Sequence, residues 1–409
     1  MNVTISSSID ARVRQKYLGH KGLIAFLALL SAFVPLSTDL YLPALPTMTA
    51  YFHVRVYQTN LTLILFFIFF SLGMLLWGPL SDKWGRRPIL LAGLALYAIA
   101  SALCAASLNI EQLIFFRVLQ ALGTGAAGAV ATAIVKDAYE GRKRESILAL
   151  VQALVIIAPA VAPVVGALLL KFTSWRGVFV TQAILGIVVV AGSAAFQETL
   201  EASSDGNIAQ TIGRLGVVLR NPGFTALLLI FSMSSITFMA FISSSSYIYQ
   251  NVFHLSSQIY SYFFAFNAMG MLVGPAVYVV LATRFKRFSI INGCFAIMIF
   301  SGVLVSVLGR SSAWLFALAL LPATIAGSCM RPPSTMLMLD QQEGDTGSAS
   351  SLMGSVATVM GSAGMIVVSI GGINLVQTIG TLNIVFGLLC GGLWLLATTM
   401  PMLREARSV

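Results

Sequence analysis

Charged side chains are scarce in this chain, and histidine and cysteine are scarcer still. Only 9% of the 409 residues are charged, whereas about a quarter are charged in a soluble domain. The three histidines have no catalytic neighbours, and no glycine loop leads into Lys-Ser or Lys-Thr, which argues against an enzyme and against an ATP-driven pump. The four cysteines lie far apart inside apolar stretches, without metal-ligand spacing. We therefore expect no catalytic residue, no metal and no cofactor.

Long apolar runs dominate what is present. The chain is 58% hydrophobic, and its mean hydropathy is +0.90. A membrane-spanning helix needs about 20 apolar residues, whereas barrel strands alternate apolar and polar side chains over about 10 residues. The runs here are unbroken, so the sequence predicts an all-α integral membrane protein with twelve transmembrane helices. The predicted helices cover residues 22–50, 56–77, 88–107, 111–135, 144–170, 176–196, 222–249, 257–281, 288–308, 312–336, 348–372 and 377–400.

The net charge of +10 comes from short basic clusters between the apolar runs. This placement is typical of the positive-inside rule rather than of nucleic-acid binding. With a cytoplasmic N-terminus, 19 basic residues, Arg331 among them, fall in cytoplasmic segments and 4 in outer segments, which leaves Arg117 as the one base inside a helix. We therefore expect both termini in the cytoplasm and no ionisable residue within the helices of the C-terminal half. No small-residue cleavage pattern follows the first apolar run, so we expect that helix to be kept.

The longest polar stretch, residues 197–221, divides the chain into two halves. Six predicted helices precede this stretch and six follow it. We expect an N-terminal six-helix bundle over 1–196, a cytoplasmic linker with one surface helix over 197–221, and a C-terminal bundle over 222–409. Basic pairs at 86–87 and 286–287 each follow the second helix of their half, which suggests that the bundles are pseudo-symmetric.

A short charged segment between the second and third helices is the most specific motif. Residues 78–88 read Gly-Pro-Leu-Ser-Asp-Lys-Trp-Gly-Arg-Arg-Pro, and the two prolines are expected to bracket a turn. The segment resembles the signature loop of the major facilitator superfamily. The resemblance implies an alternating-access transporter in which this loop is a conformational latch between the halves; the alternative is a basic loop that only sets topology. The latch residues would be Gly78, Asp82, Gly85, Arg86 and Arg87.

Asp39 is the only acidic residue predicted to lie well inside a helix. It stands in Pro-Leu-Ser-Thr-Asp-Leu-Tyr-Leu-Pro, where prolines weaken the helical hydrogen bonds. Acidic residues within membranes are costly and mark functional sites, and low-dielectric surroundings favour a protonated carboxyl group. We expect Asp39 to carry a proton; the alternative is a solvated carboxylate near the outer interface.

Arg117 begins the run Arg-Val-Leu-Gln-Ala, which resembles the R-x-x-Q-G motif in the fourth helix of the same superfamily. Ala121 stands where that motif has its glycine. A guanidinium group keeps its charge, so it needs a carboxylate or carbonyl partner. We expect an ion pair between Arg117 and Asp39 and assign both residues to proton coupling; a purely structural ion pair is the alternative.

The fifth helix carries Pro159, Pro163 and Gly166 in the run Ala-Pro-Ala-Val-Ala-Pro-Val-Val-Gly. This run resembles the antiporter motif of the superfamily, in the proline-rich form of Bcr/CflA-type multidrug and phenicol exporters. The segment Ser-Thr-Asp-Leu-Tyr-Leu-Pro around Asp39 resembles the same group. The resemblance implies a kinked fifth helix; ordinary kinked packing is the alternative.

Aromatic and methionine side chains on the predicted seventh helix, over 222–249, suggest a cavity for varied lipophilic substrates, because they give adaptable contacts. Gln152 and Asn267 are weaker candidates for the same cavity. The predicted lining residues are Thr38, Leu42, Gln120, Thr124, Val151, Val155, Phe238, Met239, Phe241 and Tyr247.

The expected function is proton-coupled export of small lipophilic compounds across the bacterial cytoplasmic membrane, driven by the proton gradient. A single membrane acid favours neutral or monocationic substrates over dications. Two alternatives stay open, namely an exporter dedicated to one metabolite, such as a siderophore or an amino-acid derivative, and a non-transporting membrane sensor. We expect the partners to be substrate, protons and lipid, without nucleic acid, and we expect a monomer.

Overall fold

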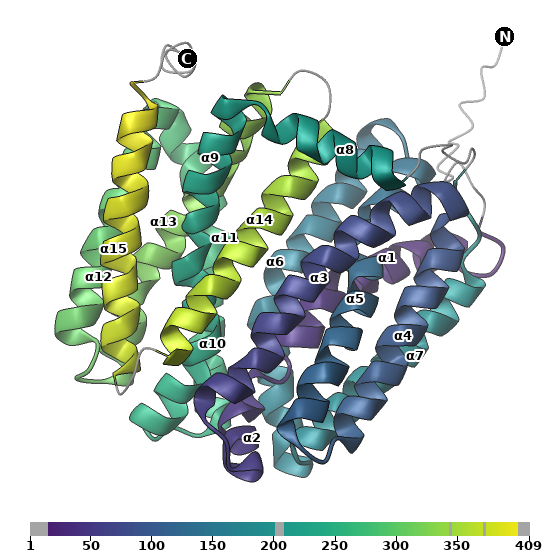
Figure 1. Cartoon of the computed structure of the whole chain (residues 1–409), viewed down its shortest axis with the longest axis horizontal. Helices are drawn as coiled ribbons and strands as arrows, with labels where there is room; N and C mark the ends of the chain where they lie inside the picture. The colour runs from purple at the N-terminus through teal and green to yellow at the C-terminus, as the bar shows by residue number, and fades with distance from the viewer. Residues whose placement is uncertain (1–14, 201–207, 343–345, 371–373, 400–409) are drawn as a thin grey trace, which may run out of the picture.

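The computed structural model describes residues 15–200, 208–342, 346–370 and 374–399, and these are helical apart from short connections (Figure 1). The ends of two predicted helices (371–372 and 400), part of the predicted linker (201–207) and both terminal segments lie outside the described residues. In chain order the elements are α1 (Gly19–Thr38), η1 (Leu42–Ala44), α2 (Leu45–Phe52), α3 (Val56–Trp84), α4 (Arg86–Ala106), α5 (Ile110–Ala138), α6 (Gly141–Phe172), α7 (Trp175–Ala195), α8 (Ile208–Leu219), α9 (Pro222–Met233), α10 (Ser235–Tyr247), η2 (Ile248–Val252), α11 (Ser257–Ala282), α12 (Arg287–Leu308), α13 (Ala313–Asp340), α14 (Thr346–Ile370) and α15 (Leu375–Ala397).

Twelve spans in the described part of the chain are long and apolar enough to cross a membrane. Six run from α1 to α7 and form one bundle, and six run from α9 to α15 and form the other (Figure 1). Helix α8 lies between the bundles at the end where both termini emerge. The bundles meet where α3 packs against α14 and where α6 packs against α11. The predicted all-α fold of two six-helix bundles is confirmed.

The first span is not one continuous helix. We predicted a helix over 22–50, but α1 ends at Thr38, and the chain resumes as η1 and α2. Pro43 and Pro46 cannot donate backbone hydrogen bonds, so the helical ladder is interrupted just after Asp39. The seventh span is likewise divided, into α9 and α10 at Ser234. Backbone groups at such breaks need other partners in a membrane.

The charged motif at residues 78–88 is not the predicted turn. Helix α3 continues through Gly78 and Pro79 to Trp84, and α4 begins at Arg86. The reversal is made at Gly85, whose φ of +98° is open to glycine but strained for other residues. The predicted end of the second helix at 77 and the predicted start of the third at 88 were wrong, because Pro79 lies inside α3 and does not end it.

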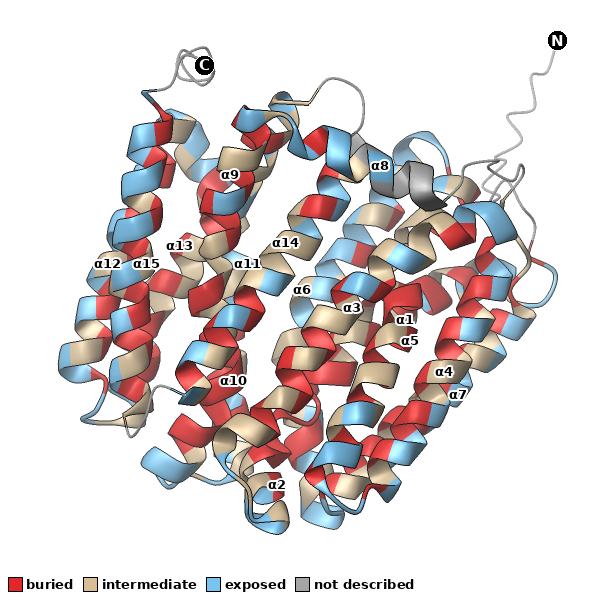
Figure 2. Ribbon diagram, in the orientation of Figure 1, coloured by how far each residue is buried: buried red, intermediate tan, exposed pale blue. Residues whose placement is uncertain are grey.

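Exposed residues lie along the outer faces of the bundles (Figure 2), and many of them are large apolar residues. On α7, for example, Ile184 and Ile187 are 57% and 61% exposed. Such a surface suits lipid rather than water. Inside the N-terminal bundle, helices approach closely through small residues, since a Cβ on Gly123 would come within 2.5 Å of the Gly93 carbonyl.

The two bundles are hydrogen-bonded at the end opposite the termini. Gln250 Nε2 donates to the Pro43 carbonyl at 3.0 Å, and Gln258 Nε2 donates to the Ala167 carbonyl at 3.0 Å. The Thr49 and Tyr247 hydroxyls also lie 3.0 Å apart. These contacts close that end of the interface between the bundles.

Candidate functional site

Two adjoining cavities occupy the interface between the bundles. The larger has a volume of about 500 Å³ and is lined by C-terminal residues; we call it the large cavity. The other, about 340 Å³, is lined by both bundles; we call it the small cavity. Both volumes suit a small molecule. Six residues line both cavities, and these are Phe238, Met239, Phe241, Met271, Thr324 and Arg331.

Asp39 lines the small cavity from the broken end of α1. Its side chain is buried, and Thr38 Oγ1 donates a hydrogen bond of 3.0 Å to its carboxylate. It is the only acidic residue among the described residues that line either cavity. The structure therefore places Asp39 at the cavity predicted for it, rather than in a solvated position at the interface.

The predicted ion pair between Asp39 and Arg117 was wrong. The ion pairs of the described residues do not include one between these two groups. Arg117 is fully buried, and its guanidinium carbon lies 4.4 Å from the ring centre of Tyr41 and 4.2 Å from that of Phe66. Both residues were expected in the outer part of the membrane, but depth alone does not fix which way a helical side chain points.

Carbonyl oxygens and a glutamine replace the carboxylate as partners of Arg117. The guanidinium group donates to the Ser37 carbonyl at 3.1 Å, to the Thr62 carbonyl at 3.3 Å and to Gln120 Oε1 at 2.5 Å. Gln120 in turn donates to Gln182 Oε1 at 2.9 Å. The R-x-x-Q pattern thus forms a buried network that satisfies backbone groups left open at the end of α1.

Six of the ten predicted lining residues line the small cavity, as do the weaker candidates Gln152 and Asn267. The six are Thr38, Val151, Val155, Phe238, Met239 and Phe241. The other four, Leu42, Gln120, Thr124 and Tyr247, line neither cavity and are buried in packing. Gln120 belongs to the Arg117 network, and the Tyr247 hydroxyl is at the closed end of the interface.

Arg331 is the residue that the sequence interpretation misplaced. We counted it among cytoplasmic residues, but it lies within α13, nine positions before the helix ends at Asp340. That separation is about 13 Å at 1.5 Å per residue. Its side chain lines both cavities. The expectation of no ionisable residue within the C-terminal helices was therefore wrong, and the charge count becomes 18 to 4.

The signal for Arg331 was present in the sequence. The predicted helix over 312–336 already contained this residue, and only its nearness to the expected helix end suggested a loop. The serine, threonine and methionine side chains of the large cavity carried a weaker signal, because these residue types are common in membrane helices.

The predicted latch residues form an ion-pair network at the end of the N-terminal bundle that carries the termini. Arg86 donates to Asp82, and its Nε donates to Asp137 at 2.9 Å. Glu198 accepts from the backbone N–H groups of Arg86 and Arg87 at 2.9 Å each, where negative charge is favoured at the start of α4. Asp82 and Asp137 belong to the N-terminal bundle, and Glu198 lies at the start of the predicted linker; none of these partners belongs to the C-terminal bundle.

A partial counterpart of this network exists in the C-terminal half. Arg287, at the start of α12, forms an ion pair of 3.3 Å with Asp340, at the end of α13. This pair joins the start of α12 to the end of α13, as the pair between Arg86 and Asp137 joins the start of α4 to the end of α5. The position that corresponds to Asp82 is Ala282, so the counterpart lacks that acid.

Helix α6 contributes Pro159 to the small cavity and includes Pro163 in its interior. Gly166 lies against the broken segment after α1, where an added Cβ would come within 1.8 Å of the Leu40 carbonyl. The glycine is therefore required for close approach of α6 to the segment that follows Asp39. Among the described residues, no three His, Cys, Asp or Glu side chains cluster as metal ligands.

Comparison with known families decides the identity of the fold. A family model described as Major Facilitator Superfamily matches residues 27–365. The chain belongs to the major facilitator superfamily. A major facilitator relative, the uncharacterized MFS-type transporter YdgK of Bacillus subtilis, is 28% identical over 86% of this chain and 89% of its own length.

Two shorter matches within the superfamily concern resistance proteins. A chloramphenicol resistance protein of Pseudomonas aeruginosa is 37% identical over 42% of each chain. The multidrug resistance protein MdtL of Shigella dysenteriae is 33% identical over 38% of this chain and 40% of its own length. The predicted family is thus confirmed, and the protein is a multi-pass membrane transporter of this superfamily.

Solved structures of other major facilitator transporters share the fold. A bacterial homologue of the human lysosomal transporter Spinster, described as inward-facing and unoccupied, superposes with a TM-score of 0.75 at 15% identity and covers 95% of this chain and 98% of its own. The nucleoside transporter NupG, as a D323A mutant, superposes with a TM-score of 0.74 at 12% identity, over 93% and 100% of the two chains.

Proposed function

We propose that this protein is a proton-coupled exporter of small lipophilic compounds that operates by alternating access. The observation that supports the proposal most is the position of Asp39, an acidic side chain within a membrane span that lines a cavity shared by the two bundles. Phenylalanine and methionine side chains around the same cavity suit apolar substrates. The names of the chloramphenicol and multidrug resistance relatives agree with this substrate class.

Asp39 would exchange protons between the two sides of the membrane. When the cavity opens outward, the carboxylate takes a proton from the outer solution. When it opens inward, the proton leaves and the substrate enters from the cytoplasm. Arg117 does not touch Asp39, so its part in coupling would be to hold the Ser37 carbonyl and thereby fix the broken end of α1.

The driving force for such an exchange is limited by the membrane potential. One proton that crosses 100 mV releases about 2.3 kcal/mol. Since about 1.4 kcal/mol corresponds to a tenfold ratio, one proton supports a gradient of a neutral compound of roughly 40-fold per 100 mV.

The orientation of the transporter is part of the proposal. The 18 to 4 distribution of basic residues outside the helices favours termini in the cytoplasm of a bacterial cell, with the protein in the inner membrane. The hydrogen bonds between the bundles would then close the outer side, and the large cavity would be reached from the cytoplasm.

The coupling can be tested with the wild-type protein in proteoliposomes that contain a pH-sensitive dye. Chloramphenicol and a panel of lipophilic compounds would be added after a proton gradient is imposed. We expect at least one compound to accelerate the collapse of the gradient, and its movement to stop when the gradient is removed by an ionophore. Transport that proceeds unchanged without a gradient would contradict the proposal.

A further inference from the structure

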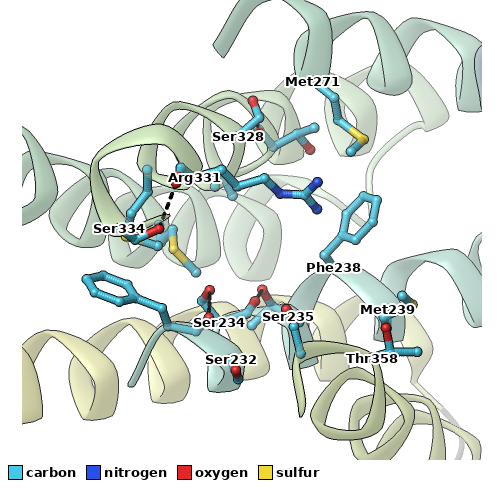
Figure 3. Close-up of a pocket in the computed structure, with 18 of the residues that line it drawn as sticks. Ser232, Ser234, Ser235, Phe238, Met239, Met271, Ser328, Arg331, Ser334 and Thr358 are labelled. Carbon is cyan, nitrogen blue, oxygen red and sulfur yellow. Dashed lines mark hydrogen bonds between the residues drawn. The ribbon is translucent and has the colours of Figure 1, made fainter. Parts of the chain in front are cut away.

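The guanidinium group of Arg331 has no bonded partner among the residues that the structure describes. Its side chain extends from α13 toward Phe238, whose ring centre lies 5.9 Å from the guanidinium carbon (Figure 3). The described side-chain hydrogen bonds and ion pairs include none from this group; the backbone carbonyl of Arg331 accepts from Ser334 Oγ at 2.9 Å. The Arg331 guanidinium group therefore faces both cavities without a hydrogen bond or ion pair to a described residue.

This lack of a partner distinguishes Arg331, which faces the cavities, from Arg117, which is fully buried in the N-terminal bundle. Arg117 is enclosed by carbonyl groups and aromatic rings and borders neither cavity. A guanidinium group cannot release its proton, and charge within a membrane protein is retained where it pairs or where it binds an ion or substrate. A charge that faces a cavity is therefore available to a bound molecule.

The surroundings of Arg331 indicate what kind of molecule would fit. Hydroxyl groups of Ser234, Ser235 and Ser328 line the large cavity near it, and the apolar walls include Phe238 and Met271 (Figure 3). The lining residues of this cavity include no acidic side chain in the described part of the chain. The chemistry fits one anionic group attached to an apolar, aromatic body.

We propose that Arg331 binds the carboxylate of an amphipathic aromatic compound, and hence that the transporter accepts lipophilic organic anions. This inference rests on the proposed export function, and it extends the expected substrates from neutral and monocationic compounds to organic anions. It also changes the charge that moves. Export of a monoanion against entry of one proton transfers two charges per cycle, whereas export of a neutral compound transfers one.

The test compares ligands that share an aromatic body and differ in charge. Chloramphenicol succinate carries a free carboxylate that chloramphenicol lacks, so these two compounds form one comparison. Naphthylacetate and N-acetylphenylalanine would each be compared with the corresponding neutral carboxamide. Binding to the purified full-length protein would be measured by calorimetry for the wild type, Arg331→Gln and Arg331→Lys. Arg310→Gln is the matched control, because Arg310 is an exposed residue of the turn before α13 and lines neither cavity.

We expect at least one carboxylate to bind the wild type about tenfold more tightly than its neutral partner. Arg331→Gln should remove that difference in affinity and leave the affinity for the neutral ligand within about twofold of the wild-type value. Arg331→Lys should keep part of the difference, and Arg310→Gln should keep all of it. The proposal is overturned if no carboxylate is preferred by the wild type, or if Arg331→Gln weakens both members of a pair equally.

A second measurement distinguishes a substrate contact from an ion pair with Asp39 in another conformation. If Arg331 acts only by neutralising Asp39, Arg331→Gln should leave the carboxylate preference unchanged in an Asp39→Asn background, which would overturn the proposal. If Arg331 binds the substrate, Arg331→Gln should remove the preference in that background as well. Because these are binding measurements, they can succeed when gradient-driven transport fails, so failure of the export function and failure of the anion site give different results. Gel filtration and melting temperature would establish that each variant is folded.

Discussion

Arg117 donates a hydrogen bond of 3.1 Å to the carbonyl of Ser37, two residues before Asp39. The buried base is thus connected to the cavity acid through the backbone rather than through an ion pair. Its aromatic neighbours Tyr41 and Phe66 enclose the guanidinium group from the sides. This arrangement assigns Arg117 to positioning of the broken segment that carries Asp39.

Substitution of Gln120 by methionine tests this positioning network. The change keeps the volume of the side chain but removes the acceptor for Arg117 and the donor to Gln182. Buried groups left without partners cost about 1–3 kcal/mol each. We expect a lower melting temperature and slower transport, whereas Gln377→Met, on the exposed start of α15, should change neither. If Gln120→Met and Gln377→Met had the same melting temperature and transport rate, the positioning role of the network would be contradicted.

Substitution of Gly166 by alanine tests the close approach between α6 and the segment after α1. The added Cβ would overlap the Leu40 carbonyl, which is backbone and cannot move aside cheaply. We expect loss of transport together with a lower melting temperature. Gly293→Ala is the matched control, because a Cβ there meets open space and alanine favours the helix by up to about 1 kcal/mol. A fully active Gly166→Ala variant would contradict the assigned role.

Substitution of Asp82 by asparagine tests the predicted latch. Arg86 would keep its bond to Asp137, and the Asp82 carboxylate is 54% exposed, so the free energy of unfolding should change by only about 0–1 kcal/mol. We expect unchanged substrate binding and transport slowed by about tenfold or more. Asp340→Asn, in the C-terminal counterpart, should slow transport much less. Normal transport rates in Asp82→Asn would remove the latch role.

The sequence predicted the architecture well because each span is a long apolar run. Hydropathy located all twelve spans, and the one acid within an apolar run, Asp39, does line a cavity. The break after Thr38 was only partly foreseen, since prolines indicate a weakened ladder but not whether the helix bends or ends.

The failures have two physical causes, which are the direction of side chains around a helix and the depth at which a helix ends. Asp39 and Arg117 were placed at a similar depth, yet Arg117 points into the N-terminal bundle and Asp39 into the cavity. For Arg331 the error was one of depth, because α13 extends past the predicted end at 336 to Asp340. Sequence patterns gave the helices but not the partners of each buried charge.

Asp39 is the proposed proton-carrying group, and substitution by asparagine tests this role directly. Asparagine keeps the shape of the side chain and cannot release a proton. Proteoliposomes with wild type, Asp39→Asn or the exposed control Glu111→Gln would be given an imposed pH gradient, and substrate accumulation would be followed over time. We predict that the wild type and Glu111→Gln accumulate substrate in proportion to the gradient, while Asp39→Asn only equilibrates it. Gradient-driven accumulation by Asp39→Asn at the wild-type level would contradict the account.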